Sequence, residues 1–380
     1  MSKAKNLGET LMELVNIYPI FSDSFLSNGR GKLSEDRLPR NVKFDYSKLE
    51  HPNALQSIYK ERCVSCVASI PNIRNARLIY FSDGIFAVET QNVGVSAKFR
   101  IDSLINIADS EREEIERWLL EGSSVNLLSS IEQAYHPEIT GTIDYKLGFA
   151  YSHNFFLQER TTPPKELLSS NQWVAGRSDF IADIWSNPAV NLVVPHHKGR
   201  MVALSALRNI TIILASMYRI QEDCVSMSRV IVEDTLSKNN LNFSVEDAER
   251  KLGLFQQFLN EVRMVDFLSD PFEEVLGKTI ASNWDWKEVC DRAVGFTGHL
   301  SSQIEKLNDK ISRRSDRRVN AILFSFTFIT VLDVSANMFS FYDLDNSVVP
   351  VFRIFYIISV FILALASVKI YLSRGDHRRK

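Results

Sequence analysis

Two long stretches with almost no charged residue close the sequence, and they constrain the fold more than any other feature. From Val319 to Tyr342 only Asp333 is charged, and from Val348 to Leu372 only two residues are charged, both near its ends. Each stretch reaches the roughly 20 residues with which a helix crosses about 30 Å of hydrocarbon. Neither keeps an amphipathic period, so we expect two membrane-spanning helices within residues 319–373; a pair of buried core helices is the alternative.

The charged flanks of these stretches predict their orientation. Arginines crowd residues 313–318, basic residues fill the tail 374–380, and the turn between the stretches carries Asp343 and Asp345 but no basic residue. Under the positive-inside rule both termini are then cytoplasmic and only a short acidic loop faces outward. Residues 1–21 lack the apolar core of a signal peptide, so we expect the body that precedes the arginines to be cytosolic.

A single apolar stripe leads into the first stretch. Its residues recur in steps of three and four, close to the 3.5-residue period of a coiled-coil seam, and no proline interrupts residues 284–349. One continuous helix from this stalk through the first span would be about 80 Å long. The narrow stripe favours packing against copies of the same chain, whereas packing on its own domain is the alternative. The stripe consists of Trp286, Val289, Ala293, Phe296, Leu300, Ile304, Leu307 and Ile311.

Further helical patterns lie upstream of the stalk. Residues 202–236 and 244–268 each show a helical period, and Ser244 with Asp247 predicts the start of the second helix. We expect these two helices to form an antiparallel hairpin. Together with the stalk they make up a helical segment over residues 199–318.

The first 198 residues predict a mixed α/β domain. Residues 76–82, 84–90 and 93–99 are β-rich and separated by turn signals, and residues 139–157 predict a further hairpin. Between them, residues 110–134 predict one helix, whose acidic start at Asp109–Glu116 is expected to be solvated. The expected fold class is therefore an α+β cytosolic domain, then long helical arms and a stalk, then two C-terminal transmembrane helices.

The sequence gives no support for an enzyme or a nucleic-acid binder. No glycine-rich phosphate loop occurs, and Lys+Arg 44 against Asp+Glu 46 leaves no basic excess. Cys63 and Cys66 form a single CxxC whose thiols would point to opposite faces of a strand, which disfavours a zinc or redox site. The basic turn formed by His196, His197, Lys198 and Arg200 is either a solvated loop or an anion or nucleotide site at the start of the following helix.

Polar residues within the first span are the strongest functional candidates. Thr330, Asp333 and Asn337 step by three and four, and Asn320 and Thr327, seven apart, roughly continue their stripe. In an oligomer these residues would line a pore with rings of oxygen ligands, which hard cations such as Mg²⁺ accept. The alternative is hydrogen bonding that only holds a helix bundle together. We expect Asp333 and Asn337 to contact metal; the threonines fit either interpretation.

These features together resemble the CorA family of divalent-cation channels. The match lies in the layout of cytosolic domain, helical arms, long stalk, acidic turn and basic tail. In that family the first span ends in Gly-Met-Asn and an aromatic residue, whereas residues 335–339 here read Ser-Ala-Asn-Met-Phe, so that only Asn337 corresponds to a mouth residue. The family's proline in this span is missing and Asp333 is an added acid. The resemblance implies a homopentamer in the bacterial inner membrane.

Three functions fit this sequence. The first is an oligomeric channel or transporter that passes divalent cations, Mg²⁺ foremost, and is gated by its cytosolic domain. The second, also suggested by proteins that look similar, is a membrane effector of a bacterial antiviral system that opens on binding a nucleotide second messenger. The third is a membrane scaffold that conducts nothing.

Overall fold

The structure of the chain is a computed structural model. It describes residues 11–26, 33–47, 63–82, 84–96, 101–139, 141, 143–148, 153–157, 174–178, 182–186, 190–196, 199–236, 245–263, 278–279, 281–283, 285–341, 351, 354–355, 358 and 362. The chain forms two compact units, Met1–Gln303 and Ile304–Lys380. The arms expected within residues 199–318 therefore share a unit with the sheet as far as Gln303.

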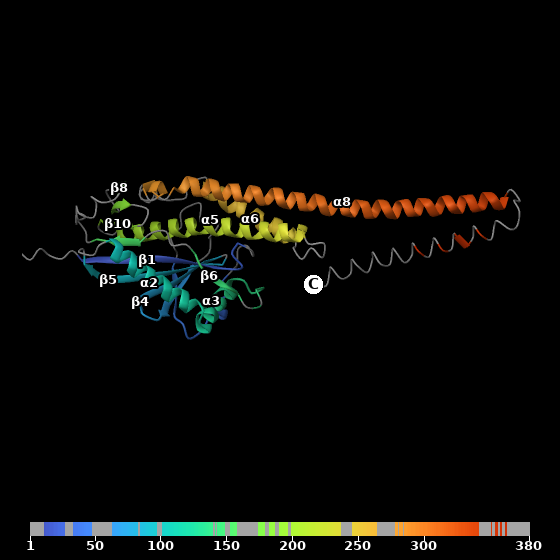
Figure 1. Cartoon of the computed structure of the whole chain (residues 1–380). Coiled ribbons are helices and arrows are strands. Elements are labelled where there is room, and N and C mark those ends of the chain that lie inside the picture. The colour runs from blue at the N-terminus through green and yellow to red at the C-terminus, as the bar shows by residue number, and fades with distance from the viewer. Residues whose placement is uncertain are drawn as a thin grey trace, which may run out of the picture. The chain divides into compact units, whose positions relative to one another are not determined.

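A mixed sheet organises the first unit (Figure 1). Among the described residues it has ten strands in the order β2-β3-β4-β5-β1-β7-β10-β9-β8, with β6 paired to β1 outside this row. Of the described strand pairs, β7 with β10 is the parallel one. The strands are β1 (Leu11–Ser22), β2 (Phe44–Ser47), β3 (Cys63–Ile70), β4 (Ile73–Ser82), β5 (Ile85–Ser96), β6 (Tyr145–Leu147), β7 (His153–Phe156), β8 (Val174–Ser178), β9 (Ala182–Ser186) and β10 (Val190–Pro195).

Strand β1 is the centre of the sheet. It pairs with β5 along one edge, and with β6 and β7 at different heights along the other. The hairpin predicted over residues 139–157 is therefore wrong, because its two strands pair with β1. The β-rich pattern of residues 76–90 is confirmed, but β5 continues through the expected turn at Asn92 as far as Ser96.

Two helices cover one face of the sheet. These are α2 (Ile101–Leu119) and α3 (Gly122–Tyr135), so the single helix predicted over residues 110–134 starts earlier and breaks near Leu120. Their apolar residues, such as Ile115 and Leu128, join a core with alternate residues of β3, β4 and β5. A short 3-10 helix, η1 (Glu35–Arg37), lies earlier in the chain and packs against α3.

Helix α5 (Gly199–Leu236) covers the opposite face (Figure 1). Tyr18 and Val88 belong to the core beneath α2 and α3, so Ile17 and Glu89, next along their strands, face the other way. Arg208 of α5 contacts Glu89 on that side. The first unit is thus an α+β fold in which helices cover both faces of one sheet.

Two further helices with described bounds follow α5. Helix α6 (Val245–Arg263) packs against α5, and the predicted cap Ser244 and the turn between the helices lie outside the described residues. Helix α8 (Trp286–Phe341) runs without a break for 56 residues, which confirms the continuous helix expected from the stalk into residues 319–341. At its start, Gln221 of α5 donates a hydrogen bond to the carbonyl oxygen of Val289 at 3.3 Å.

The first part of the apolar stripe on α8 is buried within its own chain. Trp286, Val289, Ala293 and Leu300 are at most 7% exposed, and only Phe296 reaches 37%. The preferred interpretation of the stripe as a seam between copies is therefore wrong for this part, where the alternative, packing on its own unit, describes the helix.

One helical segment in the described part of the chain has the length and composition to cross a membrane. It is Gly199–Glu233 of α5, and 78% of the apolar window is buried inside the protein. The first predicted span corresponds to the last part of α8. Most of the second predicted span lies outside the described residues, and the five described positions in it are helical.

Candidate functional site

The last part of α8 presents exposed apolar side chains. Up to Arg317 the exposed residues are largely charged or polar, and from Val319 onward they are largely apolar. Side chains between 47% and 75% exposed include Val319, Leu323, Phe324, Phe326, Phe328, Val331 and Val334. Soluble proteins rarely leave so much continuous apolar surface in water, so this segment needs lipid or another apolar surface around it.

The same pattern occurs at the described positions of the second predicted span. Val351, Ile354, Phe355, Ile358 and Ile362 are helical, and each is between 49% and 61% exposed. The described positions of the second predicted span thus favour an apolar environment by the same argument.

Three of the five predicted pore residues share one face of α8. With about 100° between successive residues of a helix, Thr330, Asp333 and Asn337 fall within about 60° of its circumference. Asn320 and Thr327 lie on an adjacent face, about 100° from the centre of this group. All five residues are exposed. On an ideal helix the three outer residues therefore form the tighter group, and the rough continuation of their stripe through Asn320 and Thr327 stays a prediction.

The threonine hydroxyls of this segment bond within the helix. Thr327 donates to the carbonyl oxygen of Leu323 and Thr330 to that of Phe326, both at 2.9 Å. Each threonine hydroxyl hydrogen is engaged in this intrahelical hydrogen bond. The hydroxyl oxygen still has lone pairs with which it can accept a hydrogen bond or bind a cation. The exposed carboxylate of Asp333 is the strongest ligand of the group.

A metal site requires more ligands than the described part of one chain brings together. Among the described residues, no three His, Cys, Asp or Glu side chains are grouped so that they would hold a metal ion. Asp333 and Asn337 supply one carboxylate and one amide per chain, so rings of ligands require several copies of α8. Asp343 and Asp345 of the predicted outer loop lie outside the described residues.

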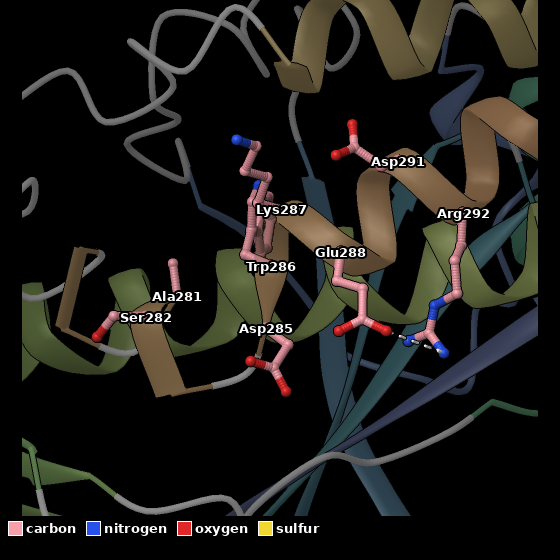
Figure 2. Close-up of a pocket in the computed structure, with 8 residues that line it drawn as sticks. All are labelled: Ala281, Ser282, Asp285, Trp286, Lys287, Glu288, Asp291 and Arg292. Carbon is pink, nitrogen blue, oxygen red and sulfur yellow. Dashed lines mark ion pairs between the residues drawn. The ribbon is translucent and has the colours of Figure 1, made fainter.

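A pocket of about 600 Å³ surrounds the start of α8 (Figure 2). Asp285 precedes the helix with φ 47°, and its carbonyl oxygen accepts a hydrogen bond from the backbone of Val289 at 3.0 Å. Figure 2 shows Asp285 and Glu288 on one side of the helix and Lys287 and Asp291 on the other. The carboxylates therefore do not point at one common ligand position. A ligand in this pocket would meet single charged side chains at the start of α8.

The predicted basic turn is paired with acids where it is described. His196 Nε2 lies 3.4 Å from Asp183 Oδ2, and Arg200 Nε donates to Glu13 Oε2 at 3.2 Å. Arg200 also lies over the ring of Phe156, 5.5 Å from its centroid. His197 and Lys198 lie outside the described residues. An anion that binds here must therefore displace carboxylates.

A buried carboxylate in α2 was missed by the sequence analysis. Glu111, only 6% exposed, accepts hydrogen bonds at 2.9 Å on one oxygen from Asn16, Tyr18 and Thr90. The solvated helix start predicted at Asp109–Glu116 is wrong here, because α2 begins at Ile101 and turns Glu111 towards the sheet. Burial, with the Glu111 charge, raises the pKa of Tyr18, which therefore stays a neutral donor.

The signal that could have found Glu111 is its spacing. Ala108, Glu111, Ile115 and Trp118 follow one another in steps of three and four, and all four are buried. An acidic residue in a helical apolar stripe indicates a buried carboxylate with partners on the facing element.

The CxxC pair gives no reactive thiol at Cys66. This side chain is buried on β3, and burial raises its pKa to about 11, so the thiolate is disfavoured at neutral pH.

Comparisons with known proteins identify no relative of this chain. No family model, curated protein or solved structure matches the chain. The resemblance to the CorA family stays a prediction that rests on the layout of the sequence.

Proposed function

We propose that the chain forms an oligomeric membrane cation channel of CorA type, passing divalent cations, Mg²⁺ foremost, under control of its cytosolic domain. The observation that carries this proposal is the continuity of α8 from Trp286 to Phe341. The same helix begins within the sheet-bearing unit and carries Asp333 and Asn337 near its end. In this proposal a movement at its start is passed along the helix to these residues.

The proposal places residues 319–373 in the bacterial inner membrane as two spans, with both termini in the cytoplasm. The exposed apolar side chains from Val319 onward support a lipid environment for α8. Arg313 and Arg317, both exposed, stand six and two residues before Val319, where cytoplasmic headgroups would lie. Residues 374–380 form the basic cytoplasmic tail.

The pore requires several copies of the chain around one axis. Asp333 is exposed on α8, and a charge at membrane depth is costly unless it faces water or a partner. If the copies are arranged so that Thr330, Asp333 and Asn337 face the axis, each Asp333 side chain faces water or the neighbouring copies. The family resemblance suggests five copies. Since the stripe from Trp286 to Leu300 is already covered, the assembly would use other surfaces of the helix.

Gating would act through the start of α8. The pocket around Asp285 and Glu288 adjoins the first helical turn, so a ligand that prefers one position of this turn would bias the position of the helix. The chemistry of that ligand separates a cation-regulated channel from the nucleotide-gated antiviral effector. A non-conducting scaffold needs no ligand.

Growth rescue tests the channel against the other two functions. A bacterial strain that lacks magnesium uptake should grow at low magnesium when it expresses the chain. Asp333→Ala should abolish rescue, whereas Phe328→Leu, on the opposite face of α8, should preserve it. Equal membrane levels of all three proteins are the control. Absence of rescue by the wild-type chain would leave the effector and the scaffold, and a purified chain that stays in solution without detergent would exclude all three.

A further inference from the structure

A second cavity, of about 410 Å³, lies in the first unit away from α8. The end of β1, strand β6 and helices α5 and α6 supply its walls. Six ionisable side chains line it, three acidic and three basic: Asp23, Glu222, Asp223, Lys146, Arg219 and Lys251. Its volume is in the range of pockets that hold small molecules, roughly 300 to 1,000 Å³.

The guanidinium of Arg219 lacks hydrogen bonds in this cavity. Its side chain is 12% exposed, and no hydrogen bond joins it to any residue in the described part of the chain. Nε lies 3.2 Å from Asp223 Oδ1 without hydrogen-bond geometry, and the nearest oxygens of Glu222 and Asp23 are 3.8 and 4.0 Å from its terminal nitrogens. Nε of Arg219 is thus buried without a hydrogen bond, and its terminal nitrogens lie beyond hydrogen-bond distance of the neighbouring carboxylates, so the guanidinium has donors left for a further acceptor.

Lys251 and Asp223 form the shortest ion pair of the cavity. Lys251 Nζ lies 3.0 Å from Asp223 Oδ2 and 5.6 Å from the ring centroid of Phe255. The rim is formed by exposed charges of both signs. Lys146 is exposed, and the side chains of Asp23 and Glu222 are 54% and 73% exposed.

We propose that this cavity binds a small zwitterion that carries an oxyanion and an ammonium group. The oxyanion accepts from Arg219 and Lys146, and the ammonium group donates to Asp23 and Glu222. Three carboxylates and three cations line the cavity, so a simple anion would meet the acids and a simple cation would meet the bases. Only a ligand with both charges is complementary to the whole lining.

Calorimetry on the detergent-solubilised full chain tests this proposal, with O-phosphoethanolamine as the probe. We expect it to bind at least tenfold more tightly than inorganic phosphate or ethanolamine, because each of these carries only half of the complementary charge. Dihexanoyl phosphatidylethanolamine forms a parallel arm: tighter binding of this lipid than of the free zwitterion identifies a headgroup as the source, and the reverse identifies a soluble metabolite.

Substitutions assign the binding to the cavity. Lys146→Gln, at the exposed rim, should weaken binding of the probe about tenfold without affecting folding, and Arg219→Gln should abolish it. Arg229→Gln, on the exposed surface of the same helix, is the matched control and should bind as the wild type does. Equal affinity for phosphate and for O-phosphoethanolamine, absence of binding to every probe, or unchanged binding in Lys146→Gln would overturn the proposal. The assay measures no ion flux, so its outcome is independent of the channel function.

Discussion

The guanidinium of Arg208 on α5 lies 2.6 Å from the carboxylate of Glu89 on β5, and the two side chains are 6% and 12% exposed. Arg208 Nε donates to the same carboxylate oxygen at 3.1 Å. This pair joins the helix to the sheet at a site largely closed to water. Removing one partner of such a pair leaves the other as a buried charge.

We predict that Arg208→Ala lowers the free energy of unfolding by about 3 to 5 kcal/mol, measured by chemical denaturation in detergent. Arg112→Ala is the control. It removes an exposed i,i+4 pair with Glu116 on α2 and should cost less than about 1 kcal/mol. Similar losses in both variants would mean that the Arg208 pair is not buried as described.

The carboxylate of Glu111 gives a second prediction. In Glu111→Gln one carboxylate oxygen becomes an NH₂ group that faces either the three donors on Oε2 or the amide of Asn92, which donates to Oε1, so an acceptor is lost on either side. The free energy of unfolding should fall by about 1 to 3 kcal/mol. Glu113→Gln, two residues along on the exposed side of α2, should change it by less than about 0.5 kcal/mol. An unaffected Glu111→Gln variant would contradict the network.

His153 predicts a pH dependence of stability. Burial lowers its pKa below the ordinary 6.5, against a smaller opposite effect of the Asp109 carboxylate. The unfolded chain therefore binds a proton that the folded chain does not, and this group destabilises the fold as the pH falls below about 6.5. Above that value both states are neutral and the effect is absent.

The test compares the wild type with His153→Gln, whose amide keeps a donor for Asn16 Oδ1, which His153 Nδ1 contacts at 3.2 Å. Between about pH 7.5 and about pH 5.5, unfolding free energy should fall more in the wild type than in the variant. Parallel curves would show that His153 does not carry this dependence.

Substitutions at two residues of the α8 stripe distinguish an intramolecular core from a seam between copies of the chain. Leu300 is fully buried and Phe296 is 37% exposed. We predict that Leu300→Ala costs about 2 to 5 kcal/mol and Phe296→Ala distinctly less, whatever the protein concentration. If the loss in Leu300→Ala disappeared on raising the protein concentration, the stripe would instead lie between copies.

Local sequence signals predicted the helices better than the sheet. The lack of proline in residues 284–349 and the steps of three and four along the stripe indicate one long helix, and α8 has that form. Strands β6 and β7 pair with β1, which lies more than 100 residues earlier in the sequence. No local sequence pattern carries this information. The hairpin at residues 139–157 failed for that reason.

The candidate site was only partly readable for a similar reason. Residue identity singled out Asp333 and Asn337, and helical spacing grouped them with Thr330. The partners of Arg200 and Glu111 were hidden, because Glu13 and Asn16 come from β1 and meet them only after the chain has folded. The cavity beside Arg219 likewise combines residues that lie far apart in the sequence.

Divalent-cation flux into liposomes that contain the purified full chain tests the central claim most directly. Wild-type protein should carry Mg²⁺ into vesicles loaded with a magnesium-sensitive dye. Asp333→Ala and Asn337→Ala should each change this flux at least several-fold while the proteins assemble as before, and Phe328→Leu should leave it unchanged. Vesicles with wild-type protein that admit no more Mg²⁺ than empty vesicles, with or without candidate ligands, would contradict the account.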